Sequence, residues 1–125
     1  MRITRSKMSW RILAQGQEQN LFLDTLALLH GYRVCELCRA LGCSARYLHV
    51  VFVRDIGLPP KDWMRRERMV VARHLLQQGL EPAAVADHLG FTKPNNFRRE
   101  FLNFYQVTPL DYQKKWRSTG THHPS

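Results

Sequence analysis

The chain has 125 residues, enough for one domain or for two small lobes that share a helix. Its 19 Lys and Arg residues outnumber its 10 Asp and Glu residues, giving a formal charge of +9, and 44% of its residues are hydrophobic. This composition excludes a disordered chain and predicts a folded protein whose partner is a polyanion, with nucleic acid ahead of an anionic membrane surface. No apolar run approaches the ~20 residues that span a bilayer, and none follows the basic start, so we expect a cytoplasmic protein without a membrane partner.

The first part of the chain is predicted to be an extension followed by short helices. Residues 1–16 show no convincing strand alternation and are expected to be partly disordered. Three helices are predicted next, over residues 17–30, 34–41 and 45–55, which together form a first lobe at 17–59. Gly42 ends the second of these helices, and Ser44 is a good N-cap for the third.

A long helix follows where the sequence Leu58-Pro59-Pro60 breaks the chain. It is predicted over 61–78, within a linker segment at 60–79 that ends at a glycine. Three shorter helices then form a second lobe at 80–117: one over 81–89, one that begins after Thr92, and one from 109 to about 117. Thr92 is the expected N-cap of the middle helix, and Pro94 is tolerated because it falls in the first turn. Residues 118–125 are expected to be a disordered tail.

The two lobes repeat one pattern. Phe52, Gly57, Pro60, Asp62 and Trp63 recur at the same offsets as Phe101, Gln106, Pro109, Asp111 and Tyr112. Upstream, Cys38 and Gly42 correspond to Ala86 and Gly90. Each copy is a short helix, a turn at glycine and a second helix with an apolar stripe, which is the outline of a helix-turn-helix. We therefore predict an all-α fold of two homeodomain-like units, whose ~18-residue linker helix, about 27 Å long, spaces two reading helices near one DNA turn.

The reading helix of the second copy separates its residues by face. At ~100° per residue, Phe97 and Phe101 lie on one side, whereas Asn95 and Arg99 point away from them with Asn96 alongside. Because Asn is a poor helix former, its place on an outward face favours a contact made by its amide over a merely solvated surface. In the major groove, Asn pairs bidentately with adenine and Arg with guanine. The pattern therefore predicts double-stranded DNA as the partner.

Three cysteines, Cys35, Cys38 and Cys43, cluster within nine positions. One interpretation is a zinc site completed by His30 or His49, and the other is a set of reduced thiols, some of them in the core. Zinc sites usually pair two Cys-x-x-Cys turns, and the single one here favours core thiols, so we expect no metal and no cofactor. The sequence has no Gly-rich phosphate loop and no His-x-x-x-His, and we expect no enzymatic activity.

Four motifs carry a family resemblance. In chain order they are Arg68-Met69-x-x-Ala72-x-x-Leu75-Leu76, Ala86-x-x-Leu89-Gly90-Phe91, Phe97-x-x-x-Phe101 and Val107-Thr108-Pro109-x-x-Tyr112. Through this string, residues 17–117 resemble the DNA-binding domain of the AraC/XylS family of bacterial transcription regulators. The resemblance implies seven helices in two lobes and a monomer that binds an asymmetric promoter element in the nucleoid. It also implies activation of transcription and RNA polymerase as a protein partner.

The resemblance also implies which residues contact bases. In the second unit the family's positions fall on Lys93, Pro94, Asn95, Asn96 and Arg99, with Arg98 nearby. In the first unit they fall on Arg46, His49 and Val50, and the outward arc of the helix also holds Val53 and Arg54. Valines cannot hydrogen-bond base edges, so this helix either touches a thymine methyl or mainly grips the backbone. His49 either donates to a base or phosphate or is a half-buried surface histidine.

Other residues are expected to contact phosphates or to support the fold. The expected phosphate contacts are Ser44, Lys61, Arg73, Thr92, Lys114 and Lys115. Arg68 matches the family's linker-helix Arg, which is expected to bond backbone carbonyls or a carboxylate between the lobes. Cys38 stands where the family has a small buried residue, which again favours a core thiol.

The chain departs from the family in two ways that leave alternatives open. The family's usual Gly after the second reading helix is Gln106 here, which requires a different or a strained turn. Residues 1–16 are too few for an effector-binding domain, so the chain is either a stand-alone regulator or a fragment of a longer activator. A third alternative is a family member that sequesters a partner protein through Val50 and Val53. A DNA-repair relative with a methyl-accepting Cys needs a four-Cys zinc site, which three cysteines do not supply.

Overall fold

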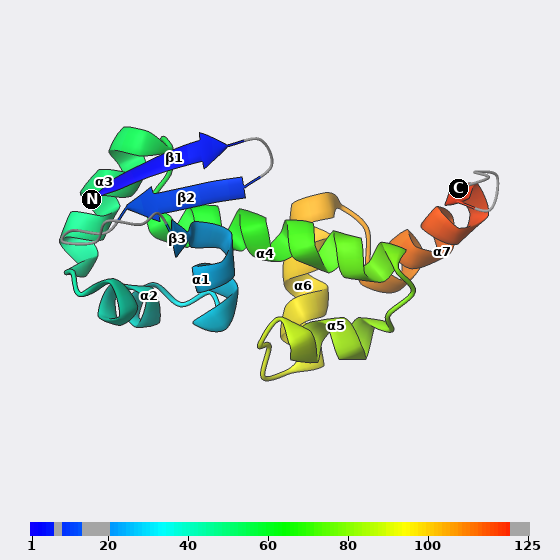
Figure 1. The fold of residues 1–125 in the computed structure, drawn as a ribbon. Coiled ribbons are helices and arrows are strands. Elements are labelled where there is room, and N and C mark those ends of the chain that lie inside the picture. The colour runs from blue at the N-terminus through cyan, green and yellow to red at the C-terminus, as the bar shows by residue number, and fades with distance from the viewer. Residues whose placement is uncertain (7–8, 14–20, 121–125) are drawn as a thin grey trace. The chain divides into compact units, whose positions relative to one another are not determined.

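The computed structural model describes residues 1–6, 9–13 and 21–120, and it divides into two compact units. The first unit is Met1–Glu67 and the second unit is Arg68–Ser125. Seven helices and three strands lie in the described ranges (Figure 1). They are β1 (Arg2–Ser6), β2 (Ser9–Leu13), β3 (Leu21–Phe22), α1 (Leu23–Leu29), α2 (Val34–Leu41), α3 (Ala45–Asp55), α4 (Pro60–Gln77), α5 (Pro82–His88), α6 (Pro94–Tyr105) and α7 (Pro109–Gly120). The predicted helical fold is confirmed, with a small sheet added to it.

The sheet corrects the prediction for the start of the chain. β1 and β2 pair antiparallel with Ile3 opposite Ile12, and both side chains are buried against the first unit. β3 pairs with β2, so Leu21 and Phe22 extend the sheet and α1 begins only at Leu23. A five-residue strand with a single buried isoleucine gives almost no period-2 signal, and the sequence pattern therefore missed both strands. Residues 17–20 of the predicted first helix lie outside the described residues.

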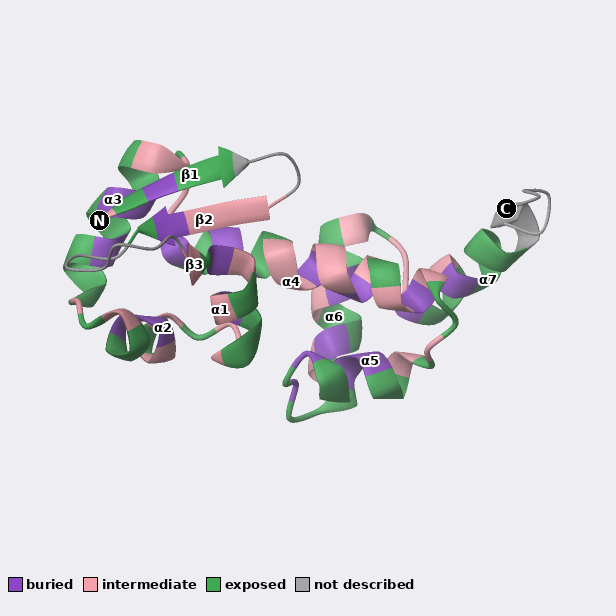
Figure 2. Ribbon diagram, in the orientation of Figure 1, coloured by how far each residue is buried: buried purple, intermediate pink, exposed green. Residues whose placement is uncertain are grey.

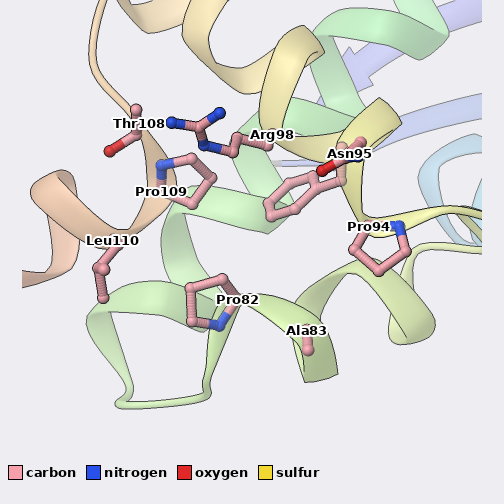
Figure 3. A pocket seen from close by; sticks show the side chains of 9 residues that line it. Pro82, Ala83, Pro94, Asn95, Arg98, Thr108, Pro109 and Leu110 are labelled. Atoms are coloured by element: carbon pink, nitrogen blue, oxygen red, sulfur yellow. The ribbon is translucent and has the colours of Figure 1, made fainter.

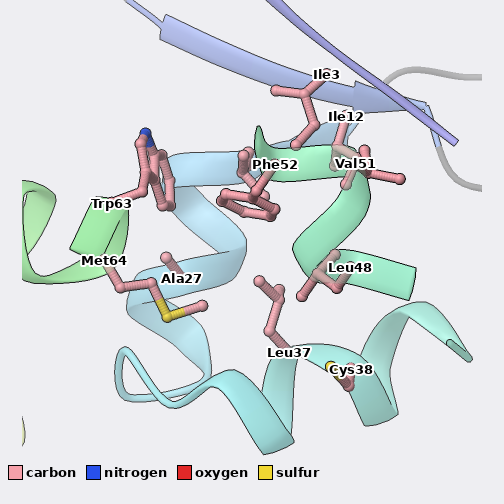
Figure 4. Packing of buried hydrophobic residues seen from close by; sticks show 11 residues of the cluster. Ile3, Ile12, Ala27, Leu37, Cys38, Leu48, Val51, Phe52, Trp63 and Met64 are labelled. Atoms are coloured by element: carbon pink, nitrogen blue, oxygen red, sulfur yellow. The ribbon is translucent and has the colours of Figure 1, made fainter. Parts of the chain in front are cut away.

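The core of the first unit gathers around Phe52 of α3 (Figure 4). The Phe52 ring meets the Trp63 ring of α4 edge to face, with 5.6 Å between centroids. Ala27 of α1, Leu37 of α2 and Leu48 of α3 close the rest of this core. One side of α3 therefore packs in the core, and its other side is exposed to solvent.

The second unit has an aromatic core on α6. Phe97 and Phe101 are fully buried, 5.8 Å apart between ring centroids, and Phe91 packs on Phe97 at 5.3 Å. Gln113 of α7 is buried and donates to the carbonyls of Leu76 and Leu80 at 3.0 and 2.7 Å, which satisfies the C-terminal end of α4. These contacts fix α6 against the other helices of this unit.

The sequence repeat corresponds to a repeated backbone turn between the two helices of each helix-turn-helix. In the first unit the Cys43 N–H donates to the Cys38 carbonyl at 3.1 Å across Gly42, whose φ is +67°. In the second unit Phe91 donates in the same way to the carbonyl of Ala86 at 2.9 Å, and the intervening glycine again has a positive φ. This is the Schellman ending of a helix, in which the two bonded residues also make an apolar contact. The glycines are required because L side chains rarely adopt this backbone.

The ends of the later helices differ in part from the prediction. Ser44 caps α3 as expected, its hydroxyl accepting the Tyr47 N–H at 3.1 Å. Thr92 does not cap α6: the N-cap is Lys93, which makes no side-chain cap bond, and Pro94 is the first helical residue. Pro starts a helix well because its missing N–H has no partner there and its φ is already helical. α7 continues to Gly120, so residues 118–120 are helical rather than disordered, and residues 121–125 lie outside the described ones.

Candidate nucleic-acid interface

α6 presents a polar face opposite its aromatic core. Asn95 and Arg99 are exposed, whereas Phe97 and Phe101 are buried, so the two pairs lie on opposite sides of the helix. Figure 2 shows that α6 carries both exposed and buried segments. The wheel-based assignment of the faces is therefore confirmed. Lys93 is also exposed, at the N-terminal end where the positive pole of the helix points outward. This end of α6 offers an amide, a guanidinium and an ammonium group to solvent.

Two of the predicted base-contacting residues are bonded to each other. The Arg99 guanidinium donates through Nη2 to Asn96 Oδ1 at 3.0 Å, one turn apart on the helix. Asn96 is half-exposed, so its side-chain oxygen accepts this bond at the flank of the outward face. The bond restricts Arg99, which by itself is a long and flexible side chain. The structure thus brings Asn95, Asn96 and Arg99 together on one surface.

Arg98 lies on a different side of α6. It lines an apolar pocket of about 250 Å³ together with Pro94, Pro109 and Leu110, at the N-terminal ends of α5, α6 and α7. In Figure 3 its side chain runs beside Thr108 and Pro109. Asn95 borders the same pocket, so the pocket adjoins the outward face of α6 without being part of it.

α3 presents an outward face of mixed character. Arg46 and His49 are exposed, and so are two valines, Val50 at 54% and Val53 at 44% of their surface. Each of these two aliphatic side chains leaves about half of its surface in water, where it gains nothing from burial. His49 is therefore a surface residue on the arc that also holds these valines, and not a half-buried one.

Arg54 is exposed, as expected for the outward arc of α3, but its guanidinium already has partners within the first unit. Its guanidinium turns back to the Asp55 carboxylate at 2.7 and 2.9 Å and to the Met1 carbonyl at 2.7 Å. The same carboxylate accepts the Ile3 N–H at 2.8 Å, which ties β1 to α3. The Arg54 hydrogen bond, followed by the Ile3 N–H, lowers the pKa of Asp55 to about 2. The helix wheel missed this role because it places residues by angle and not by which partner their side chains reach.

The predicted phosphate contacts fall into two groups. Ser44, Lys61, Thr92, Lys114 and Lys115 are exposed. Arg73 is half-buried, with its guanidinium 5.8 Å from the Tyr105 ring and its Nε buried, so packing accounts for most of this side chain. Arg68 is structural, as expected: Nε and Nη2 both donate to the Leu89 carbonyl at 3.2 and 2.9 Å, and the guanidinium stacks 3.5 Å from the Phe91 ring centroid.

The three cysteines differ in how far they are exposed to solvent. Cys35 is exposed, Cys38 is buried and Cys43 is half-buried. Burial is the main cause that raises the pKa of both Cys38 and Cys43, so these two thiols are protonated at neutral pH in the free chain. Across the described residues, no group of three or more His, Cys, Asp and Glu side chains lies close enough together to hold a metal ion.

A helix-turn-helix domain family model of the AraC type matches residues 37–115, from within α2 into α7. The chain belongs to the AraC/XylS family. Family membership places it among DNA-binding transcription regulators and not among enzymes. None of the helices in the described part of the chain is long and apolar enough to cross a membrane.

Curated relatives of this AraC-type chain are longer regulators. It is 35% identical over 83 residues to the regulatory protein PocR of Salmonella typhimurium, covering 66% of this chain and 27% of PocR. It is 27% identical over 82 residues to the transcriptional regulatory protein HptR of Staphylococcus aureus, covering 66% of this chain and 32% of HptR. The chain thus spans about a third or less of the curated relatives it matches.

Two solved domains match this AraC-type fold over most of their own length. The C-terminal domain of the two-component response regulator yesN from Fusobacterium nucleatum is 28% identical, with a TM-score of 0.65, covering 72% of this chain and 91% of that one. The DNA-binding domain of the global transcriptional factor AdpA, solved in complex with a target DNA, has a TM-score of 0.70 at 24% identity. That match covers 79% of this chain and 93% of the AdpA domain, and it shows a shared fold.

Proposed function

We propose that this AraC-type chain is a sequence-specific regulator whose α3 and α6 each enter the major groove of a promoter element. The observation that carries the proposal is the outward face of α6, where Asn95, Asn96 and Arg99 are gathered opposite a fully buried aromatic core. A major groove admits one α-helix, and the formal charge of +9 supplies the attraction to phosphates. A rigid helix with a fixed polar face is what direct base reading requires.

On α6, the amide of Asn95 suits adenine and the guanidinium of Arg99 suits guanine. Each good bidentate pair discriminates against a wrong base by roughly 1–3 kcal/mol. The bond from Arg99 to Asn96 supports this role because an already oriented guanidinium loses less conformational entropy on binding. Lys93 at the start of the helix adds a cation near the phosphates of the same groove.

On α3, the exposed Val50 and Val53 favour contacts with thymine methyl groups, which are the only apolar features of the major groove. Arg46 and His49 flank them with groups that hydrogen-bond to bases or phosphates. Phosphates are then held by exposed residues around both helices: Ser44, Lys61, Thr92, Lys114 and Lys115. Arg73 is a weaker candidate because Tyr105 already packs against it.

The family suggests how DNA binding would regulate transcription. We expect the chain to bind DNA in the cytoplasm as a monomer with two reading helices. We expect it to activate transcription through contact with RNA polymerase. Because the matched segment makes up only 27% of PocR and 32% of HptR, the same two surfaces fit a DNA-binding fragment of a larger activator equally well. A different function, capture of a partner protein without specific DNA binding, is favoured only by the exposed valines of α3.

The test is selection of binding sites from a random DNA pool at about 150 mM salt, where non-specific phosphate binding is weak. Wild type and Arg99→Ala are compared, with Arg39→Ala as a matched control because Arg39 is an exposed cation on α2. A bipartite motif that loses one half only in Arg99→Ala supports reading by both helices. A single half-site means that α3 grips the backbone alone, and no enriched sequence contradicts specific reading and favours protein capture.

A further inference from the structure

The first unit contains a cavity that has no part in the outward face of α3. It has a volume of about 340 Å³ and is lined by residues of β1, β2, the turn after α3 and the first turns of α4. The lining residues that matter here are Arg5, Trp10, Leu58, Trp63, Arg66 and Glu67. The size lies in the range of sites for small organic ligands.

One wall of the cavity carries a hydrogen-bond donor without a partner. Trp63 is 2% exposed, and its Nε1 is buried with no hydrogen-bond partner among the described residues. In Figure 4 this nitrogen points away from Met64, on the side of the ring that does not face the core. A buried N–H without an acceptor is rare in folded proteins and calls for a ligand or a bound water. Trp10, by contrast, has its side-chain partner in the Glu67 carboxyl.

The remaining walls combine flat aromatic surface with positive charge. The Trp10 and Trp63 rings meet edge to face, 6.4 Å apart between centroids. The Arg5 guanidinium lies 4.9 Å from the Trp10 ring centroid, and Arg66 provides a second cation on the same lining. Glu67 is the one carboxyl on the lining. Because two guanidinium groups outnumber one carboxyl, the lining favours a ligand with a negative charge. The two indole rings favour a ligand that also has a flat, apolar part.

We propose that this cavity binds a small aromatic carboxylate. Its ring packs on Trp10 and Trp63, its carboxylate pairs with Arg5 and Arg66, and one carboxylate oxygen accepts the Trp63 indole N–H. A bare inorganic anion leaves the indole rings unused, and a neutral ring leaves two guanidinium groups to share the single Glu67 carboxyl of the lining. The inference goes beyond DNA recognition and does not depend on it.

The place of the cavity connects it to α3. Leu58, in the turn that follows α3, lines one part of the cavity, and Arg5 and Trp10 of the β1–β2 hairpin line another. The same hairpin is held to α3 because the Asp55 carboxylate accepts the Ile3 N–H. A ligand that bridges hairpin and turn therefore stabilises the packing that holds α3 in place. If the chain binds an operator, ligand and DNA then affect each other's affinity by the same factor.

The experiment follows the indole N–H signals of ¹⁵N-labelled full chain by NMR during titration with benzoate, without DNA. Benzamide is the neutral control of the same shape, and inorganic phosphate is the control for an adventitious anion. The expected result is a saturable shift of the Trp63 signal with benzoate, binding at least roughly tenfold weaker for benzamide, and no shift of Trp116, which lies in the second unit. No saturable shift up to about 10 mM benzoate, or an equal response to phosphate, overturns the proposal.

Variants separate the ligand site from a site for water. Trp63→Phe keeps an aromatic ring and removes the N–H, and Arg66→Gln removes one cation at an exposed position that folding tolerates. With the Trp10 signal as readout, each variant is expected to weaken benzoate binding by roughly tenfold, whereas the neighbouring Arg65→Gln leaves it unchanged. Unchanged binding in Arg66→Gln, or a Trp63 N–H that contacts only water at saturating benzoate, contradicts the proposed site.

Discussion

Arg99 of α6 donates a hydrogen bond of 3.0 Å to the Oδ1 atom of Asn96, so two residues on the candidate reading face are already coupled before any DNA is bound. The bond holds a guanidinium on the outward side of a helix whose inward side is fixed by Phe97 and Phe101. The bond also gives Asn96 a role that a helix wheel cannot predict, because Asn96 orients the Arg99 side chain whether or not Asn96 itself contacts a base. This coupling is measurable.

We expect the effects of Asn96→Ala and Arg99→Ala on operator affinity to be non-additive. Arg99→Ala removes about 1–3 kcal/mol of discrimination at one base pair, and Asn96→Ala removes part of the same free energy because it frees the guanidinium. A double-mutant cycle measured by competition between the selected site and its single-base variants should give a coupling of about 0.5–1 kcal/mol. Additive losses would mean that the two side chains contact DNA independently. Arg39→Ala serves as the control that removes a cation without touching this face.

Gln106 offers a test of stored backbone strain. It follows α6 in the left-handed conformation, with φ at +62°, where an L side chain costs about 1 kcal/mol and glycine costs none. Gln106→Gly should therefore raise the free energy of unfolding by about 1 kcal/mol, less what is lost with the bond from Gln106 Nε2 to the Asn103 carbonyl. Urea unfolding measures the change. Gln106→Ala is the control, since it removes that bond and keeps the strain, and it should be neutral or slightly destabilising.

Arg68 should be important for stability and not for base reading. Its two N–H groups satisfy the Leu89 carbonyl at the C-terminal end of α5, and its guanidinium stacks on Phe91. Arg68→Met keeps the length of the side chain and leaves that carbonyl without its donor, so the free energy of unfolding should fall by about 2 kcal/mol. Arg65→Met, an exposed change on the same helix, should lower it by less than about 0.5 kcal/mol. Equal losses in the two variants would contradict the assigned role.

The sequence was informative where periodicity or turn chemistry is strong. Gly42 and Gly90 mark the two turns that the structure shows as matching Schellman endings, and the faces of α6 follow from Phe97 and Phe101. The hairpin escaped prediction because its attachment depends on contacts distant in sequence: Ile3 and Ile12 pack in the core of the first unit, and the Ile3 N–H donates to the Asp55 carboxylate. Such pairings across 52 residues have no local signal.

The sequence also did not predict in which direction long charged side chains point. A wheel places Arg54 on the outward arc of α3, but the nearest acceptors, the Asp55 carboxylate and the Met1 carbonyl, draw its guanidinium back to the hairpin. Arg73 was predicted to contact phosphate, but it is half-buried and its guanidinium lies 5.8 Å from the Tyr105 ring centroid. Long charged side chains settle on whichever partner lies within reach, which depends on the fold and not on the spacing of residues.

Asp55 makes the stability of the first unit depend on acid. The Arg54 guanidinium and the Ile3 N–H lower the folded-state pKa to about 2, from an ordinary value of 3.8 in the unfolded chain. Since the folded pKa is the lower one, the carboxylate's contribution is fully present above about pH 4 and is lost as the pH falls toward 2. We expect a contribution of about 1 kcal/mol, because Arg54 is half-exposed and solvent screens the pair.

Asp55→Asn should therefore unfold more easily than wild type at pH 6 and equally at pH 2, as measured by urea unfolding at each pH. Glu36→Gln, at an exposed pair on α2, is the matched control and should show a smaller difference at pH 6. A constant gap between wild type and Asp55→Asn from pH 6 to pH 2 would show that the amide disturbs packing and that the charge does not anchor the hairpin.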